Sequence, residues 1–157
     1  MDQNEQLMRE AIRQSKAGMD KGEGGPFGAI VVKDGRIVGR GNNRVLATND
    51  PTAHAEVVAI RDACQNLGSF QLDDCEIYTS CEPCPMCLGA IYWARPKRVY
   101  FGCTRTDAAN IQFDDDFIYE EIGAPLEQRK IPMIPLLREE ALVVFREWQE
   151  KSDKTLY

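Results

Sequence analysis

Four residues of this chain have the types and spacing needed to bind and use a metal ion. His54 is the only histidine in the sequence and lies two residues before Glu56, and the run Pro83, Cys84, Cys87 reads P-C-x-x-C. Imidazole and thiolate groups are typical zinc ligands. Three protein ligands leave the fourth position of a tetrahedral zinc to water, whereas a structural zinc has four protein ligands. The spacing therefore predicts one catalytic Zn²⁺ per subunit, bound by His54, Cys84 and Cys87, with Glu56 as a free carboxylate.

Such a site is suited to hydrolysis. Zinc lowers the pKa of a bound water to about 7, so a zinc hydroxide is the expected nucleophile. Glu56 would act as the proton shuttle, taking a proton from this water and delivering it to the substrate. The pattern H-x-E followed by P-C-x-x-C is typical of zinc deaminases that act on nucleobases.

A structural zinc site is the main alternative reading of the same residues. Cys81 extends the pattern to C-x-x-C-x-x-C, so three cysteines and His54 could form a closed site. The protein would then be a zinc-stabilised interaction module without enzymatic activity, and Glu56 would have no task. An iron–sulfur cluster would need a further cysteine at suitable spacing, and the next one is Cys103.

Two predicted helices position the ligands. One is expected to run to about Leu67, with Asp50 as its cap and Pro51 at its first position, and it carries His54 and Glu56. The second covers 86–94, so Cys84 and Cys87 lie on one face of its first turn. The positive end of a helix favours thiolate over thiol.

The remaining pattern predicts an α/β fold. Strands are expected at 28–33 and 36–41, joined by a turn at Asp34-Gly35, because Asp-Gly is a strong hairpin signal. Strands at 76–80 and 98–102 alternate with the helices, which favours a partly parallel sheet. The other expected elements are a helix at 3–20, a short helix at 116–122, a possible edge strand at 131–137 and a helix at 138–151.

Composition limits the class of protein. At 157 residues the chain is expected to be a single domain, without a leader or an apolar run of the roughly 20 residues that span a membrane, hence cytoplasmic. Residues 107–157 carry 6 basic and 12 acidic side chains, so this segment accounts for the whole net charge of −6. This balance argues against a nucleic-acid partner, because phosphates are bound by Lys and Arg.

Three longer runs carry a family resemblance: GGPFGAIVVKDG, NDPTAHAEVVAIR and TSCEPCPMCLGAIYWARP. They resemble the cytidine deaminase-like superfamily, and within it the bacterial guanine deaminases. The resemblance implies a three-layer α/β/α sandwich with a mixed five-stranded sheet. It implies a single deaminase domain over 1–157, a homodimer that exchanges its C-terminal segment (about 131–157), and hydrolysis of guanine to xanthine and ammonia in purine salvage or catabolism.

The same resemblance implies roles for individual residues. His54, Cys84 and Cys87 match the zinc ligands, Glu56 the proton shuttle, and Asp115 a second carboxylate that protonates the departing amine. The residues it assigns to the purine pocket are Asn43, Phe27, Trp93, Ala55 and Tyr157. The sequence leaves open which aspartate of 114–116 faces the pocket.

Two related activities remain open. A tRNA adenosine deaminase shares the NDPTAHAE and PCxMC motifs, although Trp93 and the acidic last third depart from that pattern. A guanosine deaminase would need only additional room for a ribose. The expected partner is therefore a small-molecule purine, with no nucleic acid and no membrane.

Overall fold

The computed structural model describes residues 2–157 and divides into two compact units, one reaching to Asp116 and the other spanning Phe117–Tyr157. The first unit contains the sheet and all residues of the predicted zinc site.

The sheet of the first unit has the strand order β2-β1-β3-β4. Its strands are β1 (Gly28–Lys33), β2 (Arg36–Asn42), β3 (Cys75–Cys81) and β4 (Arg98–Cys103). β1 pairs antiparallel with β2 and β3, whereas β3 and β4 are parallel, so the sheet is mixed. Asp34 and Gly35 both have positive φ, which confirms the predicted hairpin turn.

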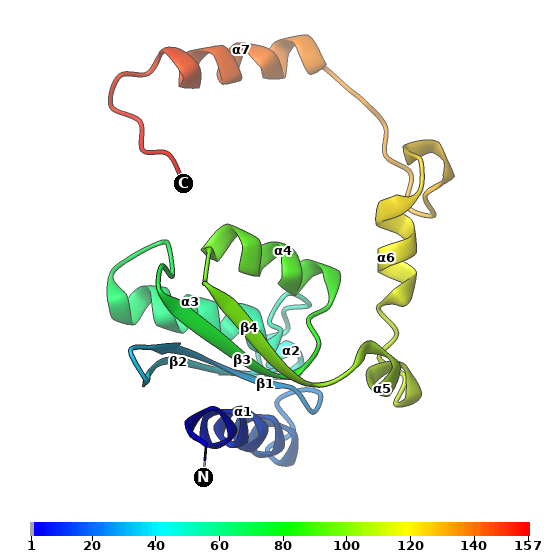
Figure 1. Ribbon diagram of the computed structural model, residues 1–157. Helices are drawn as coiled ribbons and strands as arrows, with labels where there is room; N and C mark the ends of the chain where they lie inside the picture. The colour runs from blue at the N-terminus through cyan, green and yellow to red at the C-terminus, as the bar shows by residue number, and fades with distance from the viewer. Residues whose placement is uncertain (1) are drawn as a thin grey trace. The chain divides into compact units, whose positions relative to one another are not determined.

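Helices cover both faces of this sheet, which confirms the α/β/α layering (Figure 1). α1 (Gln3–Asp20) lies on one face, and α3 (Ala55–Leu67) and α4 (Pro85–Ala94) lie on the other. Alternate side chains of a strand point to opposite faces. Accordingly Tyr78 is buried in the cluster that includes Ala11 of α1, while Ile77 is buried with Ala59 and Ile91 of α3 and α4.

The prediction of a five-stranded sheet is wrong for the described residues, because their sheet has four strands. The candidate edge strand at 131–137 forms neither strand nor helix. Its two prolines lack the N–H groups that a strand donates to its neighbour.

The expected helix start at Asp50 and Pro51 is also wrong, because α3 begins at Ala55. Asp50 caps a turn instead: its carboxylate accepts the Thr52 N–H at 2.8 Å and its carbonyl accepts the Ala53 N–H at 3.1 Å. This turn makes His54, rather than Asp50, the N-terminal cap residue of α3.

The second unit contains the helix α6 (Asp116–Gly123) except for its first residue, the 3₁₀ turn η1 (Leu126–Gln128) and the helix α7 (Arg138–Glu150). None of its residues is buried, and α7 exposes Val144, Phe145 and Trp148. No helix within residues 2–157 combines the length and the apolar character needed to cross a membrane.

Candidate zinc and catalytic site

His54 is held at the N-terminus of α3 by a close approach of this helix to the sheet. A Cβ atom on Gly41 of β2 would lie only 2.3 Å from the carbonyl oxygen of Ala55. Glycine at this position therefore lets the first turn of α3, which follows His54 directly, pack on the strand.

The two cysteines come from the start of α4. Cys84 is the N-terminal cap residue, Pro85 takes the first helical position, where its missing N–H costs nothing, and Cys87 is buried in the first turn. The N-terminal ends of α3 and α4 therefore meet at the same place, and both favour negative charge there.

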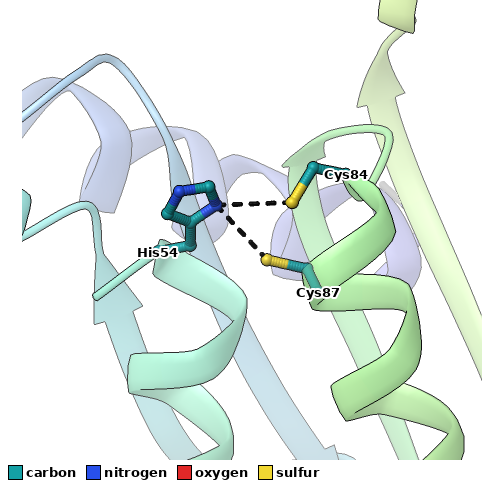
Figure 2. A group of neighbouring side chains, drawn as sticks. All are labelled: His54, Cys84 and Cys87. Atoms are coloured by element: carbon teal, nitrogen blue, oxygen red, sulfur yellow. Dashed lines mark hydrogen bonds between the residues drawn. The ribbon is translucent and has the colours of Figure 1, made fainter. Parts of the chain in front are cut away.

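The three side chains converge on one point (Figure 2). The Nδ1 atom of His54 lies 3.5 Å from the Sγ atoms of both Cys84 and Cys87. The three ligand atoms all lie within 4.8 Å of one another. Tetrahedral zinc with ordinary bond lengths separates its nitrogen and sulfur ligands by about 3.6 Å. The donor set therefore fits a zinc ion, with Nδ1 as the histidine ligand atom.

Cys81 does not join this group among the described residues. Its thiol donates to the carbonyl of Thr104 at 3.7 Å, and burial raises its pKa to about 12. The structure thus offers three protein ligands, which is the number expected for a catalytic zinc and not for a closed structural one.

The thiol groups of the two ligands differ in acidity. The hydrogen bond from Cys87 lowers the pKa of Cys84 to about 4, and contact with His54 acts in the same direction. The Cys84 thiolate in turn raises the pKa of Cys87 and, as a hydrogen-bond partner, that of His54. The contacts within the site therefore favour the thiolate form of Cys84.

Glu56 lies in the first turn of α3 beside these ligands and is 6% exposed. Burial raises its pKa to about 7, although hydrogen bonds from its own backbone and from Cys87 act in the opposite direction. A carboxyl group with such a pKa can both accept and release a proton near neutral pH.

Asp115 is the aspartate of its run that turns inward. The carboxylate of Asp114 accepts the Asp116 N–H at 3.0 Å, and Asp116 pairs with Arg105 at 3.6 Å. By contrast, Oδ1 of Asp115 is buried and has no hydrogen-bond partner among the described residues. Burial raises the pKa of Asp115, and the Cys84 thiolate adds to this shift. An unpaired buried carboxylate oxygen beside the ligand set is free to bind a ligand.

Asn43, Phe27 and Ala55 lie near the start of α3, in the same unit. Asn43 is 6% exposed; its side-chain oxygen accepts the Val45 N–H at 3.1 Å, which leaves its NH₂ group as a donor. Its backbone N–H donates to the Phe27 carbonyl at 3.0 Å. The Phe27 ring meets Phe113 edge-on, with centroids 4.9 Å apart. Sequence reasoning missed Phe113, which the aromatic position two residues before Asp115 could have indicated.

Two expected pocket residues are not part of this buried group. Trp93 lies on the outer side of α4 and is 64% exposed, because the buried residues of this helix are Cys87, Ile91 and Ala94. Tyr157 belongs to the second unit and is 68% exposed. Their roles stay predictions.

The fold and the three-ligand site define a zinc-dependent deaminase, and the chain belongs to that class. Residues 1–103 match the family of the cytidine and deoxycytidylate deaminase zinc-binding region. The chain is 54% identical over 154 residues to guanine deaminase of Bacillus subtilis, covering 98% of this chain and 99% of that protein. The solved structure of the Bacillus subtilis guanine deaminase aligns with 100% of this chain and 99% of its own, with a TM-score of 0.96.

More distant relatives have two kinds of activity. A tRNA-specific adenosine deaminase of Aquifex aeolicus is 43% identical over 97 residues, which are 62% of this chain and 64% of that protein. A structure of guanine deaminase from Nitrosomonas europaea is 29% identical, with a TM-score of 0.67 over 90% of this chain and 81% of its own.

Proposed function

We propose that this protein hydrolyses guanine to xanthine and ammonia. The observation that carries the proposal is the set of three zinc ligands with the buried carboxyl of Glu56 beside it. Similarity over nearly the whole chain to the Bacillus subtilis guanine deaminase supports guanine as the base. The alternative of a structural zinc module gives no reason to bury the carboxyl group of Glu56 beside the zinc ligands.

His54, Cys84 and Cys87 would hold one zinc ion, which lowers the pKa of a coordinated water to about 7 and so supplies the nucleophile. Glu56 takes a proton from the attacking water and delivers it to the ring nitrogen next to C2 of guanine. Its pKa of about 7 suits both steps, because the carboxylate accepts the proton without holding it too tightly.

Asp115 is the second proton donor in this proposal. The exocyclic amine must leave as ammonia and needs a further proton. Burial raises the pKa of Asp115, and its Oδ1 atom has no competing hydrogen bond among the described residues. Protonated Asp115 can therefore donate to the departing nitrogen, and it regains a proton from the hydroxyl group added to C2, which becomes the carbonyl of xanthine.

The purine is held by an aromatic and a polar wall. The Phe27 ring offers an apolar surface, the NH₂ group of Asn43 donates to a purine acceptor, and Ala55 lies between the metal ligand and Glu56. Trp93 and Tyr157 complete this pocket in the proposal, the latter from a partner subunit.

We further propose that the protein is a cytoplasmic homodimer in which each deaminase domain receives the segment of about 131–157 from the other copy. Exposed apolar side chains on α7, among them Phe145 and Trp148, support a partner surface. Free cysteines throughout the described chain agree with a reducing compartment.

Coexpression of Glu56→Gln with Tyr157→Ala tests the exchange. Each mixed dimer would contain one intact site, so activity should return to about a quarter of that of the wild type. A mixture as inactive as its two parents would contradict the exchanged arrangement.

The base is tested by incubating the zinc-loaded protein with guanine, guanosine, adenine, cytosine and cytidine and measuring ammonia. Release from guanine alone is expected. Turnover of guanosine at an equal rate would point to a nucleoside enzyme, and turnover of cytidine alone would overturn the proposal.

A tRNA adenosine deaminase is the second candidate, because a relative of this activity matches the first part of the chain. Formation of inosine in tRNA, with binding that weakens steeply as salt rises, would favour it over guanine.

A further inference from the structure

Glu23, in the loop between α1 and β1, binds the residues on both sides of Asn43. Its Oε2 atom accepts the side-chain amide of Asn42 at 2.9 Å and pairs with Nη1 of Arg44 at 2.5 Å. The Glu23 side chain is 20% exposed and that of Arg44 is 39% exposed. The ion pair is thus partly shielded from water, which strengthens it relative to a surface pair.

The backbone around Glu23 makes a second set of contacts with the same segment. The Glu23 carbonyl accepts the N–H groups of Leu46 and Ala47, at 3.1 and 3.0 Å, in the short helix α2 (Val45–Thr48). Next to it, Gly24 lies so close that a Cβ atom there would be 2.1 Å from Oδ1 of Asn43. Residues 42–47 are therefore held by both the side chain and the main chain of Glu23.

These contacts determine how Asn43 presents its amide. Because Oδ1 of Asn43 accepts from Val45, the direction of its NH₂ group depends on the backbone at Arg44 and Val45. The Arg44 N–H also donates to the carbonyl of Ala53 at 2.9 Å, directly before His54. The segment that Glu23 holds thus connects the side-chain amide of Asn43 with the start of the helix that follows His54.

We propose that Glu23 is a positioning residue for purine binding: by fixing Asn42 and Arg44 it orients the Asn43 amide toward the base. The inference rests on the proposed function, since it takes a purine as the ligand of Asn43. Among the described residues, the hydrogen bonds of Glu23 involve neither the zinc ligands nor Glu56 or Asp115.

The test compares Glu23→Ala, Glu23→Gln, Arg44→Ala and the Glu23→Ala/Arg44→Ala double variant. Loss of one well-placed hydrogen bond predicts a KM for guanine about 3–10-fold higher in Glu23→Ala, with kcat and zinc content unchanged. Glu23→Gln should be intermediate, because its amide oxygen still accepts from Asn42 but no longer pairs with a charge. The double variant should resemble the single ones, because the two residues act through one contact.

Hydrogen exchange of the peptides covering residues 42–48 gives a readout that does not depend on turnover. Faster exchange is expected in Glu23→Ala, because the backbone bonds of Leu46 and Ala47 are loosened. Glu5→Ala is the matched control: it removes a carboxylate that pairs with Arg9 at 3.3 Å on the exposed side of α1, and KM and exchange should stay as in the wild type.

A higher KM without faster exchange, or faster exchange with an unchanged KM, would overturn the proposal. If the wild type releases no ammonia from guanine, the proposed function fails. Hydrogen exchange in Glu23→Ala would still test whether Glu23 holds residues 42–47 in place. Faster exchange would support this role, and unchanged exchange would refute it.

Discussion

Gly41→Ala should weaken zinc binding although residue 41 is not a ligand. A Cβ atom at this position would lie 2.3 Å from the Ala55 carbonyl oxygen and 2.5 Å from the Ala59 nitrogen, both backbone atoms of α3. Ordinary contacts are longer by about 1 Å, so the start of the helix must move away from β2 by roughly that amount. Overpacking of this kind costs about 1–3 kcal/mol.

The same movement displaces His54, the residue directly before α3. Zinc ligands keep their distances within about 0.2 Å, so a shift of roughly 1 Å is large. We expect zinc affinity to fall by about 10–100-fold, the size of effect found when the support of a ligand is lost. Tm should fall by roughly 2–4 °C for each kcal/mol.

The assays are a competition between the protein and a chelator for zinc, and calorimetric unfolding of the zinc-free protein. Gly89→Ala is the control in the other ligand-bearing helix, because its new Cβ would meet no atom of the described chain within 4 Å apart from the adjoining residues and the backbone of its own helix. It should keep zinc affinity and gain up to about 1 kcal/mol of stability. Gly41→Ala with the zinc affinity and Tm of the wild type would refute the view that this contact positions His54.

Glu56→Gln should retain zinc but lose about 10²–10⁴-fold in kcat, because the amide cannot shuttle a proton. A variant that binds zinc in metal analysis and keeps the kcat of the wild type would contradict this role. Asp115→Asn should also keep zinc and lower kcat about tenfold or more, with the loss measured as ammonia release from guanine. Removing zinc with a chelator should abolish turnover, and restored activity on adding Zn²⁺ checks that the protein survived. Burial raises the pKa of Tyr78 to about 12, so the contribution of this group to stability is fully present below pH 10 and falls by on the order of 2–3 kcal/mol as the pH rises to 12. Urea unfolding of Tyr78→Phe should show a smaller fall over this range, and an equal fall would exclude the tyrosine as its cause.

The sequence by itself determined the chemistry of the zinc site and the elements that carry it. Histidine, glutamate and two cysteines at this spacing have few other uses, and local signals such as the Asp34-Gly35 turn act through neighbouring residues. These features depend on residue type and short-range geometry, which are read directly from the chain.

Only the tertiary structure decided which of the similar groups lie beside the zinc ligands. Asp114, Asp115 and Asp116 are chemically alike, and burial beside Cys84 distinguishes Asp115. Cys81 has ligand spacing, yet its position on β3 directs its thiol to Thr104. The absence of a fifth strand within the described sheet and the contacts of Glu23 with Asn42 and Arg44 likewise depend on residues that are distant along the chain. Spacing along the chain cannot give burial or orientation, because both are set by the packing of helices on the sheet.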